Sequence, residues 1–245
     1  MSTRVVLRGR ELDGVEKSIR SLDAFDIVEE APDLVVTHGG DGALLGAEYE
    51  FPGVPKLPIR DAKAGPLCPE HDSVENSLLS FEEGRSELTE LPKLEGAAEN
   101  VRITGINDVF IHNVDRVGAL RYRVLIDDEP YGHEIIGDGV GVATVHGSTA
   151  YYRSITHSIF KIGIGLAFSN STEVTNHLVL PENSVVTVKV VRGPGLLVAD
   201  NRPDIIEIPN GGVITIRRIG ETALIYGLDA FMCPKCRRLR HPREW

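Results

Sequence analysis

The spacing of apolar residues changes between the two parts of the chain that meet near Gly96. In the first part, residues 3–9 (TRVVLRG) and 33–37 (DLVVT) predict strands. The second of these runs is continuous, as in a strand that is covered on both faces. Residues 11–22 (ELDGVEKSIRSL) and 74–84 (VENSLLSFEEG) have apolar positions at helical spacing. This mixture of strands and helices predicts an α/β domain.

Two segments of this first part lack a regular period. Residues 51–72 are rich in proline and are expected to be irregular. Residues 87–100 (ELTELPKLEGAAEN) are acidic and are interpreted as a connector between domains. The α/β domain is therefore expected to span residues 1–97.

Beyond residue 100, short apolar runs alternate or nearly alternate with polar residues, and turn residues separate the runs. Such alternation is typical of strands that bury one face. We therefore expect an all-β, sandwich-like C-terminal domain over residues 98–227. Its strands are predicted from the runs at 101–106, 108–113, 119–128, 139–145, 161–168, 184–191 and 212–219.

The composition narrows the class of protein. The formal net charge of −10 argues against binding to nucleic-acid phosphates, which proteins contact with basic residues. No apolar run approaches the roughly 18 residues that a membrane span needs, and the N-terminus lacks the apolar core of a signal peptide. Three cysteines, an odd number, do not suggest a disulfide framework. We expect a soluble cytoplasmic protein that binds neither nucleic acid nor membranes.

Candidate chemistry begins at residues 35–47 (VVTHGGDGALLGA), where a predicted strand runs into three glycines around one carboxylate. A strand, a glycine turn and a helix start form an anion site, because the first N–H groups of the helix point toward the ligand. Asp41 would repel a phosphate, so it suits a base for a hydroxyl nucleophile, or a metal ligand. An ordinary Asp-Gly turn is the alternative. The candidate residues are Gly39, Gly40, Asp41 and Gly42.

Two further stretches carry groups that suit a nucleoside. Residues 144–151 (TVHGSTAY) place hydroxyls, a small residue and an aromatic ring where a strand ends. In GINDVFIHN, Asn107 offers an amide that can read adenine, and Asp108 offers a carboxylate that can hold ribose hydroxyls. A Ser-Thr helix cap and an Asn-Asp turn are the ordinary alternatives.

Taken in order, these stretches resemble the NAD kinase family. The resemblance covers roughly residues 30–230 and is specific because several motifs occur in the family's order. It implies a two-domain protein that phosphorylates NAD to NADP with ATP and Mg²⁺. The matching motifs are GGDG at 39–42, ND at 107–108, DG at 138–139 and TVHGSTAY at 144–151, and NHLVLPENSVVTV at 176–188 is similar to a further family segment.

By this resemblance, Asp41 is the base that activates the 2′-hydroxyl of the adenosine ribose of NAD for attack on a γ-phosphate. Asn107 would read the adenine. Asp108 stands in place of the family's glutamate and would lie beside the nicotinamide ribose. The sequence departs from the family at His146, where threonine or serine is usual, and at 154–157 (SITH) and 57–65 (LPIRDAKAG). The dinucleotide site would be lined by Asp138, His146, Ser148, Thr149, Ala150, Tyr151 and Ser154.

Two other functions stay open on the sequence. A related kinase of a lipid or another small molecule would share the Gly-Gly-Asp-Gly turn, although the GSTAY corner argues against it. A dinucleotide-binding protein that no longer catalyses would account for the departures at His146 and after Ser154. The choice of ATP or polyphosphate as donor, and of NAD or NADH as acceptor, is also open. The resemblance further implies a homodimer or homotetramer assembled through the β-rich domain.

A structural zinc site is a separate hypothesis. CPEH supplies Cys68 and His71, and CPKC supplies Cys233 and Cys236, each pair with two intervening residues. Three thiolates and an imidazole make a closed tetrahedral zinc set. The pairs can meet only if the tail, residues 228–245, packs back on the first domain, as tails of the resembled family do. An incidental Cys-x-x-Cys on a solvated tail is the alternative.

Overall fold

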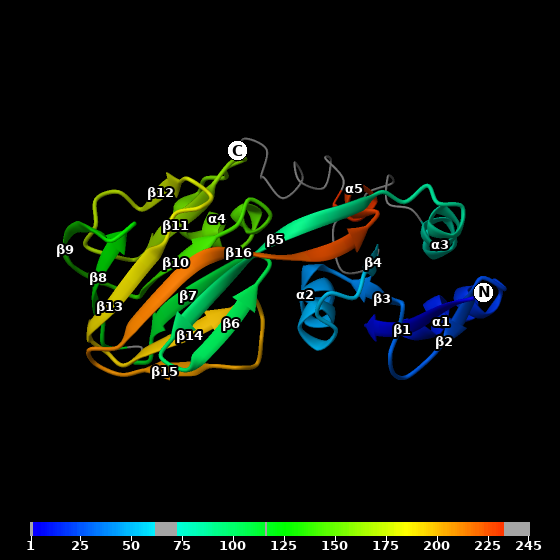
Figure 1. Ribbon diagram of the computed structural model, residues 1–245, viewed down its shortest axis with the longest axis horizontal. Coiled ribbons are helices and arrows are strands. Elements are labelled where there is room, and N and C mark those ends of the chain that lie inside the picture. Colours follow the sequence, from blue (N-terminus) through cyan, green and yellow to red (C-terminus); the bar gives the residue numbers. More distant parts are fainter. Residues whose placement is uncertain (1, 62–72, 116, 233–245) are drawn as a thin grey trace. The chain divides into compact units, whose positions relative to one another are not determined.

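The computed structural model describes residues 2–61, 73–115 and 117–232 (Figure 1). The chain divides into two compact units. The first unit contains the residues up to Leu91 and the segment that begins at Ala223, and the second runs from Pro92 to Thr222. Strands β5 (Leu88–Ala98) and β16 (Val213–Tyr226) each contribute residues to both units.

The first unit is built on a parallel sheet, as its continuous apolar strands predict. The strand order is β2 (Phe25–Ile27), β1 (Thr3–Gly9), β3 (Leu34–Gly39) and β4 (Lys56–Arg60). Ile225 of β16 pairs with Lys56 in the same direction. Every residue of β3 is buried. The core of this unit contains Val5, Val15, Ile19, Leu34, Val36, Leu57, Ile59 and Leu78.

Helices connect and cover these strands. The helix predicted over 74–84 is confirmed as α3, and its N-terminus is capped by Ser73, whose side chain accepts a hydrogen bond from the N–H of Asn76 at 3.2 Å. Among the described residues, no helix has the length and apolar character needed to cross a membrane. The helices of the first unit are α1 (Leu12–Arg20), α2 (Asp41–Glu50), α3 (Val74–Glu82) and α5 (Leu228–Phe231).

A buried ion pair ties α2 to β4. Lys56 is 0% exposed, and its ammonium group bonds to the carboxylate of Glu48 and to the carbonyl oxygen of Phe51, the latter at 2.7 Å. The other carboxylate oxygen of Glu48 accepts from the backbone N–H of Gly53 at 3.2 Å. Because these charges are paired and hydrogen-bonded, they are tolerated in the core.

The second unit consists of two antiparallel sheets that share one core, which confirms the sandwich-like prediction. One sheet has the order β16, β13 (Val186–Arg192), β8 (Leu120–Ile126) and β9 (Glu129–Gly137), with β5 pairing β16 and β6 (Val101–Gly105). The other has the order β12 (His177–Leu180), β11 (Ile164–Ser169), β10 (Gly139–Ala143), β7 (Asp108–Asn113), β14 (Gly195–Ala199) and β15 (Ile206–Ile208). Both sheets contribute to the core, with Tyr122, Val124, Val188 and Ile214 from the first and Val109, Ile111, Val142 and Leu166 from the second.

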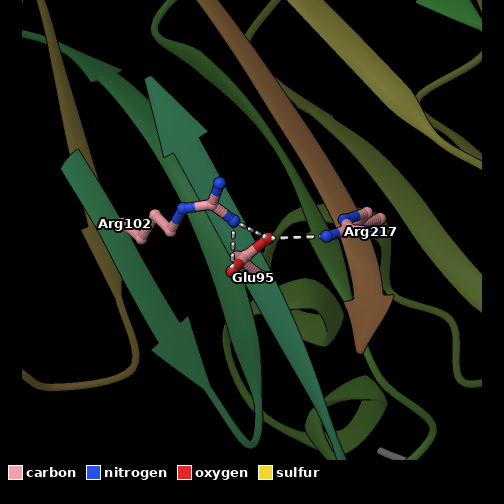
Figure 2. A network of polar contacts seen from close by, with 3 residues as sticks. All are labelled: Glu95, Arg102 and Arg217. Carbon is pink, nitrogen blue, oxygen red and sulfur yellow. Dashed lines mark hydrogen bonds and ion pairs between the residues drawn. The ribbon is translucent and has the colours of Figure 1, made fainter. Parts of the chain in front are cut away.

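The interpretation of residues 87–100 as an acidic connector was wrong, because β5 occupies most of this segment. Leu94 points into the core, while Glu95 lies on the opposite face. Figure 2 shows the carboxylate of Glu95 between Arg102 and Arg217, which come from β6 and β16. The contacts are 3.1 Å to Arg102 and 3.2 Å to Arg217. Burial alone would raise the pKa of Glu95, but these hydrogen bonds outweigh it and the net pKa is lowered.

The prediction that residues 51–72 are irregular was also wrong in part. The segment contains β4, although Pro58 lies in its middle. Leu57 and Ile59 are each 2% exposed, so burial of these side chains stabilises the strand. This strand matters for function because it ends beside the glycine turn.

Candidate functional site

Asp41 is the first residue of α2 and directly follows the glycines at the end of β3. Gly39 has a φ of +149°, a conformation that favours glycine, and Gly40 is the extended residue that precedes the helix. The N-terminus of this ten-residue helix lies at the carboxyl edge of the parallel sheet, where such folds bind ligands. The side chain of Asp41 is 24% exposed, so its carboxylate is within reach of a ligand at the turn.

Arg60, the last residue of β4, lies next to this turn. The strand register pairs it with Gly39, and the backbone N–H of Asp61 donates to the carbonyl oxygen of Gly39 at 3.1 Å. Nη2 of Arg60 is 4.0 Å from Oδ1 of Asp41. Nε of Arg60 donates to the carbonyl oxygen of Phe231 at 3.1 Å, and the guanidinium carbon lies 4.8 Å from the centre of the Phe231 ring. A cation anchored by α5 therefore lies beside the predicted base.

In the second unit, one carboxylate holds the turn that carries Asn107 and Asp108. Asp200 follows β14, the neighbour of β7. Its Oδ2 accepts from the N–H of Ile106 at 2.7 Å, and its Oδ1 accepts from the N–H groups of Asn107 at 2.7 Å and Asp108 at 3.1 Å. The N–H of Asp200 donates back to the carbonyl oxygen of Asp108 at 3.1 Å. The position of both predicted contact residues thus depends on Asp200.

The pKa values of Asp108 and Asp200 are both raised, and the charge of Asp200 contributes to the shift of Asp108. Burial, with a further contribution from the charge of Asp200, raises the pKa of Asp108 to about 7. Burial likewise raises the pKa of Asp200, although the three N–H groups and Arg202 oppose this shift. The carboxyl group of Asp108 is therefore partly protonated at neutral pH and can donate as well as accept a hydrogen bond.

The turn after β10 closes on the same segment. The backbone N–H of Thr144 donates to the carbonyl oxygen of Asn107 at 2.8 Å, and Oγ1 of Thr144 donates to that of Ile106 at 2.6 Å. Gly147 approaches so closely that a Cβ there would lie 2.0 Å from the carbonyl oxygen of Asn107. Oδ1 of Asn107 is a buried acceptor that lacks a hydrogen-bond partner in the structure. The two predicted stretches are therefore brought together around an acceptor that a ligand could satisfy.

Tyr151 lies over the middle of β7. It begins α4 (Tyr151–Thr156), and its ring centre is 4.9 Å from that of Phe110 and 5.5 Å from that of His112. Tyr151 is 41% exposed, so its ring is accessible to a base. Burial lowers the pKa of His112, an effect that the charge of Asp138 opposes. Asp138 precedes Gly139, the register partner of His112, and accepts from Nδ2 of Asn170 at 2.9 Å.

The remaining predicted contact residues lie in the 3₁₀ turn η1 (Gly147–Thr149) and in α4. Ser148 is 1% exposed, and its hydroxyl donates to the carbonyl oxygens of Val145 and Phe160 at 2.7 and 3.2 Å. The hydroxyl of Thr149 donates to the carbonyl oxygen of His146 at 3.3 Å. In contrast to Ser148, the partly buried His146, Thr149 and Ala150 and the exposed Ser154 are accessible to a ligand.

The predicted zinc ligands Cys68, His71, Cys233 and Cys236 lie outside the described residues. Across residues 2–61, 73–115 and 117–232, no group of three or more His, Cys, Asp or Glu side chains is placed to hold a metal ion.

Sequence reasoning missed three residues of these sites. The alternation of DVFIHN places Phe110 and His112 on one face, which was a usable signal for His112. Asp200 contacts residues more than 90 positions earlier, and Arg60 contacts Phe231, 171 positions later. Local patterns carry no information about contacts at such separations.

Comparison with known proteins supports the family resemblance. No family model matches the chain. The NAD kinase of Thermomicrobium roseum is 28% identical over 82% of this chain and 72% of its own length. Among solved structures, yeast NADH kinase complexed with NADH has a TM-score of 0.81 at 18% identity and covers 100% of this chain and 89% of its own. An NAD kinase from Archaeoglobus fulgidus in complex with ATP has a TM-score of 0.75 at 18% identity and covers 97% and 98%. With the motif order, these likenesses show that the chain resembles NAD kinases over most of its length and shares their fold.

Proposed function

We propose that the protein is an NAD kinase that transfers the γ-phosphoryl group of ATP to the 2′-hydroxyl of the adenosine ribose of NAD, giving NADP and ADP. The observation that carries the proposal is the position of Asp41 at the N-terminus of α2, within the glycine turn of a chain that resembles NAD kinases. As the 2′-oxygen attacks the γ-phosphorus, its proton passes to the Asp41 carboxylate. The bond from the γ-phosphorus to the bridging oxygen breaks, and ADP leaves.

The second unit supplies the groups for NAD recognition. The unsatisfied Oδ1 of Asn107 suits the amino group of adenine, and the exposed ring of Tyr151 suits stacking on the base. Asp108 and Asp138 suit ribose hydroxyls, because a carboxyl group accepts hydrogen bonds from them. The accessible residues His146, Thr149, Ala150 and Ser154 would complete the contacts.

The described residues fit a Mg²⁺ ion that is bound mainly by the nucleotide. No cluster of three or more potential ligand side chains occurs among them. Magnesium in phosphoryl-transfer sites is held by substrate phosphates with one or two carboxylates, and Asp41 and Asp61 are the carboxylates of this edge. When bound, the ion balances the charge of the transferring phosphoryl group.

The direct test is formation of NADP from ATP, Mg²⁺ and NAD by purified protein. Asp41→Asn keeps the shape and removes the base, so turnover should fall about 10²–10⁴-fold while NAD affinity, measured by calorimetry, is retained. Asp13→Asn is the matched control, because Asp13 is an exposed carboxylate in the first turn of α1. Wild-type turnover in Asp41→Asn would refute the assignment of the base.

The same assay separates the alternatives. Replacing ATP by polyphosphate, or NAD by NADH, identifies the donor and the acceptor. A protein that binds NAD in the calorimeter but forms no NADP with either donor is a non-catalytic homologue. A protein that phosphorylates a lipid and ignores NAD is a kinase of the other class.

We also propose a homodimer or homotetramer that assembles through the second unit. Exposed apolar side chains of the second unit support this assembly. Val145, Ile162 and Val179 are 37%, 78% and 46% exposed, and they line a cavity of about 610 Å³. Strand β12 forms an edge of the adjacent sheet. Light scattering at micromolar concentration tests this, and a monomer would refute it.

The zinc site formed by Cys68, His71, Cys233 and Cys236 is also proposed, on the spacing of the ligands alone. Elemental analysis of protein purified without added metal should find about one zinc per chain. Less than about a tenth of an equivalent, with Cys233→Ser as stable as wild type, would exclude the site.

A further inference from the structure

A cationic side chain, that of Arg60, lies at the carboxyl edge of the parallel sheet in the first unit and is not part of the GGDG motif. Arg60 stands within the segment where this sequence departs from the family pattern. Because β4 pairs in parallel with β3, the register places Arg60 beside Gly39, the first glycine of the turn. The charge of this side chain therefore lies at the same edge as Asp41.

The guanidinium group is held in one orientation by α5. Its Nε donates a hydrogen bond to the carbonyl oxygen of Phe231 at 3.1 Å, and its central carbon, Cζ, lies 4.8 Å from the centre of the Phe231 ring. The side chain of Arg60 is 11% exposed. Such a cation–π contact and backbone anchor reduce the rotamer freedom that a long side chain loses when it binds a ligand.

The anchoring directs a terminal nitrogen toward the turn. Nη2 of Arg60 is 4.0 Å from Oδ1 of Asp41, which is close enough for ionic attraction and longer than a hydrogen bond. An incoming phosphoryl oxygen can therefore accept from Nη2 without breaking a short hydrogen bond between the two side chains.

We propose that Arg60 binds the terminal phosphate of the nucleoside triphosphate and holds it beside Asp41. The inference rests on the proposed kinase function. The carboxylate of Asp41 repels the negatively charged phosphoryl group, and the guanidinium of Arg60 offsets that repulsion at a fixed distance. Its planar pair of terminal N–H donors matches two phosphoryl oxygens, which an ammonium group does not. Arg60 is thus a substrate-binding residue for the phosphoryl donor and has no role toward NAD.

The test measures binding without turnover, with inorganic tripolyphosphate and Mg²⁺-ATP as the probes and calorimetry as the assay. Arg60→Gln should weaken binding of both probes about 10- to 100-fold, because a charge-assisted hydrogen bond is lost. Arg60→Lys should weaken binding about 3- to 10-fold, because it keeps the charge and loses the planar fork. In turnover, Arg60→Gln should raise the KM for ATP, while NAD affinity stays within twofold of wild type.

Arg8→Gln is the matched control. Arg8 also lies over a phenylalanine ring, at 5.0 Å from Phe51, and pairs with the carboxylate of Glu50. Glu50 is at the opposite end of α2 from Asp41, about 14 Å away along the helix axis. Probe binding by Arg8→Gln should match wild type within twofold.

Two results would overturn the proposal: no tripolyphosphate binding by wild type, or binding by Arg60→Gln within twofold of wild type. If thermal unfolding shows that Arg60→Gln does not fold, Arg60→Lys decides, and wild-type affinity in that variant overturns the proposal. Failure of the kinase function is a separate outcome, since it appears as absence of NADP from the wild-type protein.

Discussion

Replacing Asp200 by asparagine should destabilise the second unit by about 2–4 kcal/mol. The side chain of Asp200 accepts from three backbone N–H groups, two through Oδ1 and one through Oδ2. Asparagine has a single acceptor oxygen. If that oxygen takes the Oδ1 position, its NH₂ group faces the N–H of Ile106, and the reverse orientation leaves two N–H groups without an acceptor.

The magnitude follows from this count. A buried N–H group without a partner costs about 1–3 kcal/mol. The two bonds that remain lose the ionic character that roughly doubles their strength, which adds about 1 kcal/mol. Loss of the negative charge also removes its repulsion of Asp108, so the pKa of Asp108 should fall and offset part of the cost.

Urea denaturation followed by far-ultraviolet circular dichroism measures the change, and calorimetry with NAD reports whether the Asn107-Asp108 turn has moved. NAD affinity should fall together with stability. Asp204→Asn is the control, because Asp204 is 46% exposed and pairs with Arg202 at the surface, so its loss should cost less than about 0.5 kcal/mol. A loss below that level in Asp200→Asn would refute the role given to the carboxylate.

Three further outcomes are expected. Tyr151→Ala should weaken NAD binding by about 1–3 kcal/mol, as for base–aromatic stacking. Tyr49→Ala, at an equally exposed tyrosine, is the control and should leave NAD affinity unchanged. If Tyr151→Ala lowers thermal stability but leaves NAD affinity unchanged, Tyr151 is a packing residue. Because the pKa of Asp108 is raised to about 7, its contribution to stability is fully present below about pH 4 and is lost as the pH rises through 7. The unfolding free energy should therefore decline by up to about 4 kcal/mol over this range, and Asp108→Asn should remove that slope. Lys56→Met leaves Glu48 buried without its cation, so the unfolding free energy from urea denaturation should fall by about 3–5 kcal/mol. Arg20→Met is the control: it breaks the exposed pair with Glu16 and should lower the unfolding free energy by less than about 0.5 kcal/mol.

Patterns of local sequence predict the parts of the fold that local physics determines. The continuous apolar run of β3 and the glycines after it were sufficient to place Asp41 at the start of a helix. The alternation of the later strands was sufficient to predict the sandwich. The sequence analysis missed β5 because its acidic residues suggest a solvated connector. In the structure, β5 pairs with β6 and β16, and Arg102 and Arg217 from these strands bind Glu95 (Figure 2).

The candidate sites also contain residues that local motifs identify and residues that come from distant parts of the chain. Asn107, Asp108 and Tyr151 could be named as candidates because each lies within a short motif that resembles the family's, and their roles toward a ligand stay predictions. The groups that fix their positions could not be named, because the N–H groups of residues 106–108 are bound by a carboxylate from a distant strand end. Residue type alone does not identify such a partner among the 36 acidic residues of the chain.

The contacts from the turn after β10 hold the main chain of residues 106–107 and leave the amide oxygen of Asn107, although it is buried, without a hydrogen-bond partner in the structure. Thr144 and Gly147 contact the main chain of residues 106–107, and a side chain at position 147 would collide with it. In a saturation library, position 147 should accept glycine alone, whereas position 107 should yield folded protein with many side chains. Base preference can therefore drift, or be redesigned, by exchange at one position without rebuilding the scaffold that presents it.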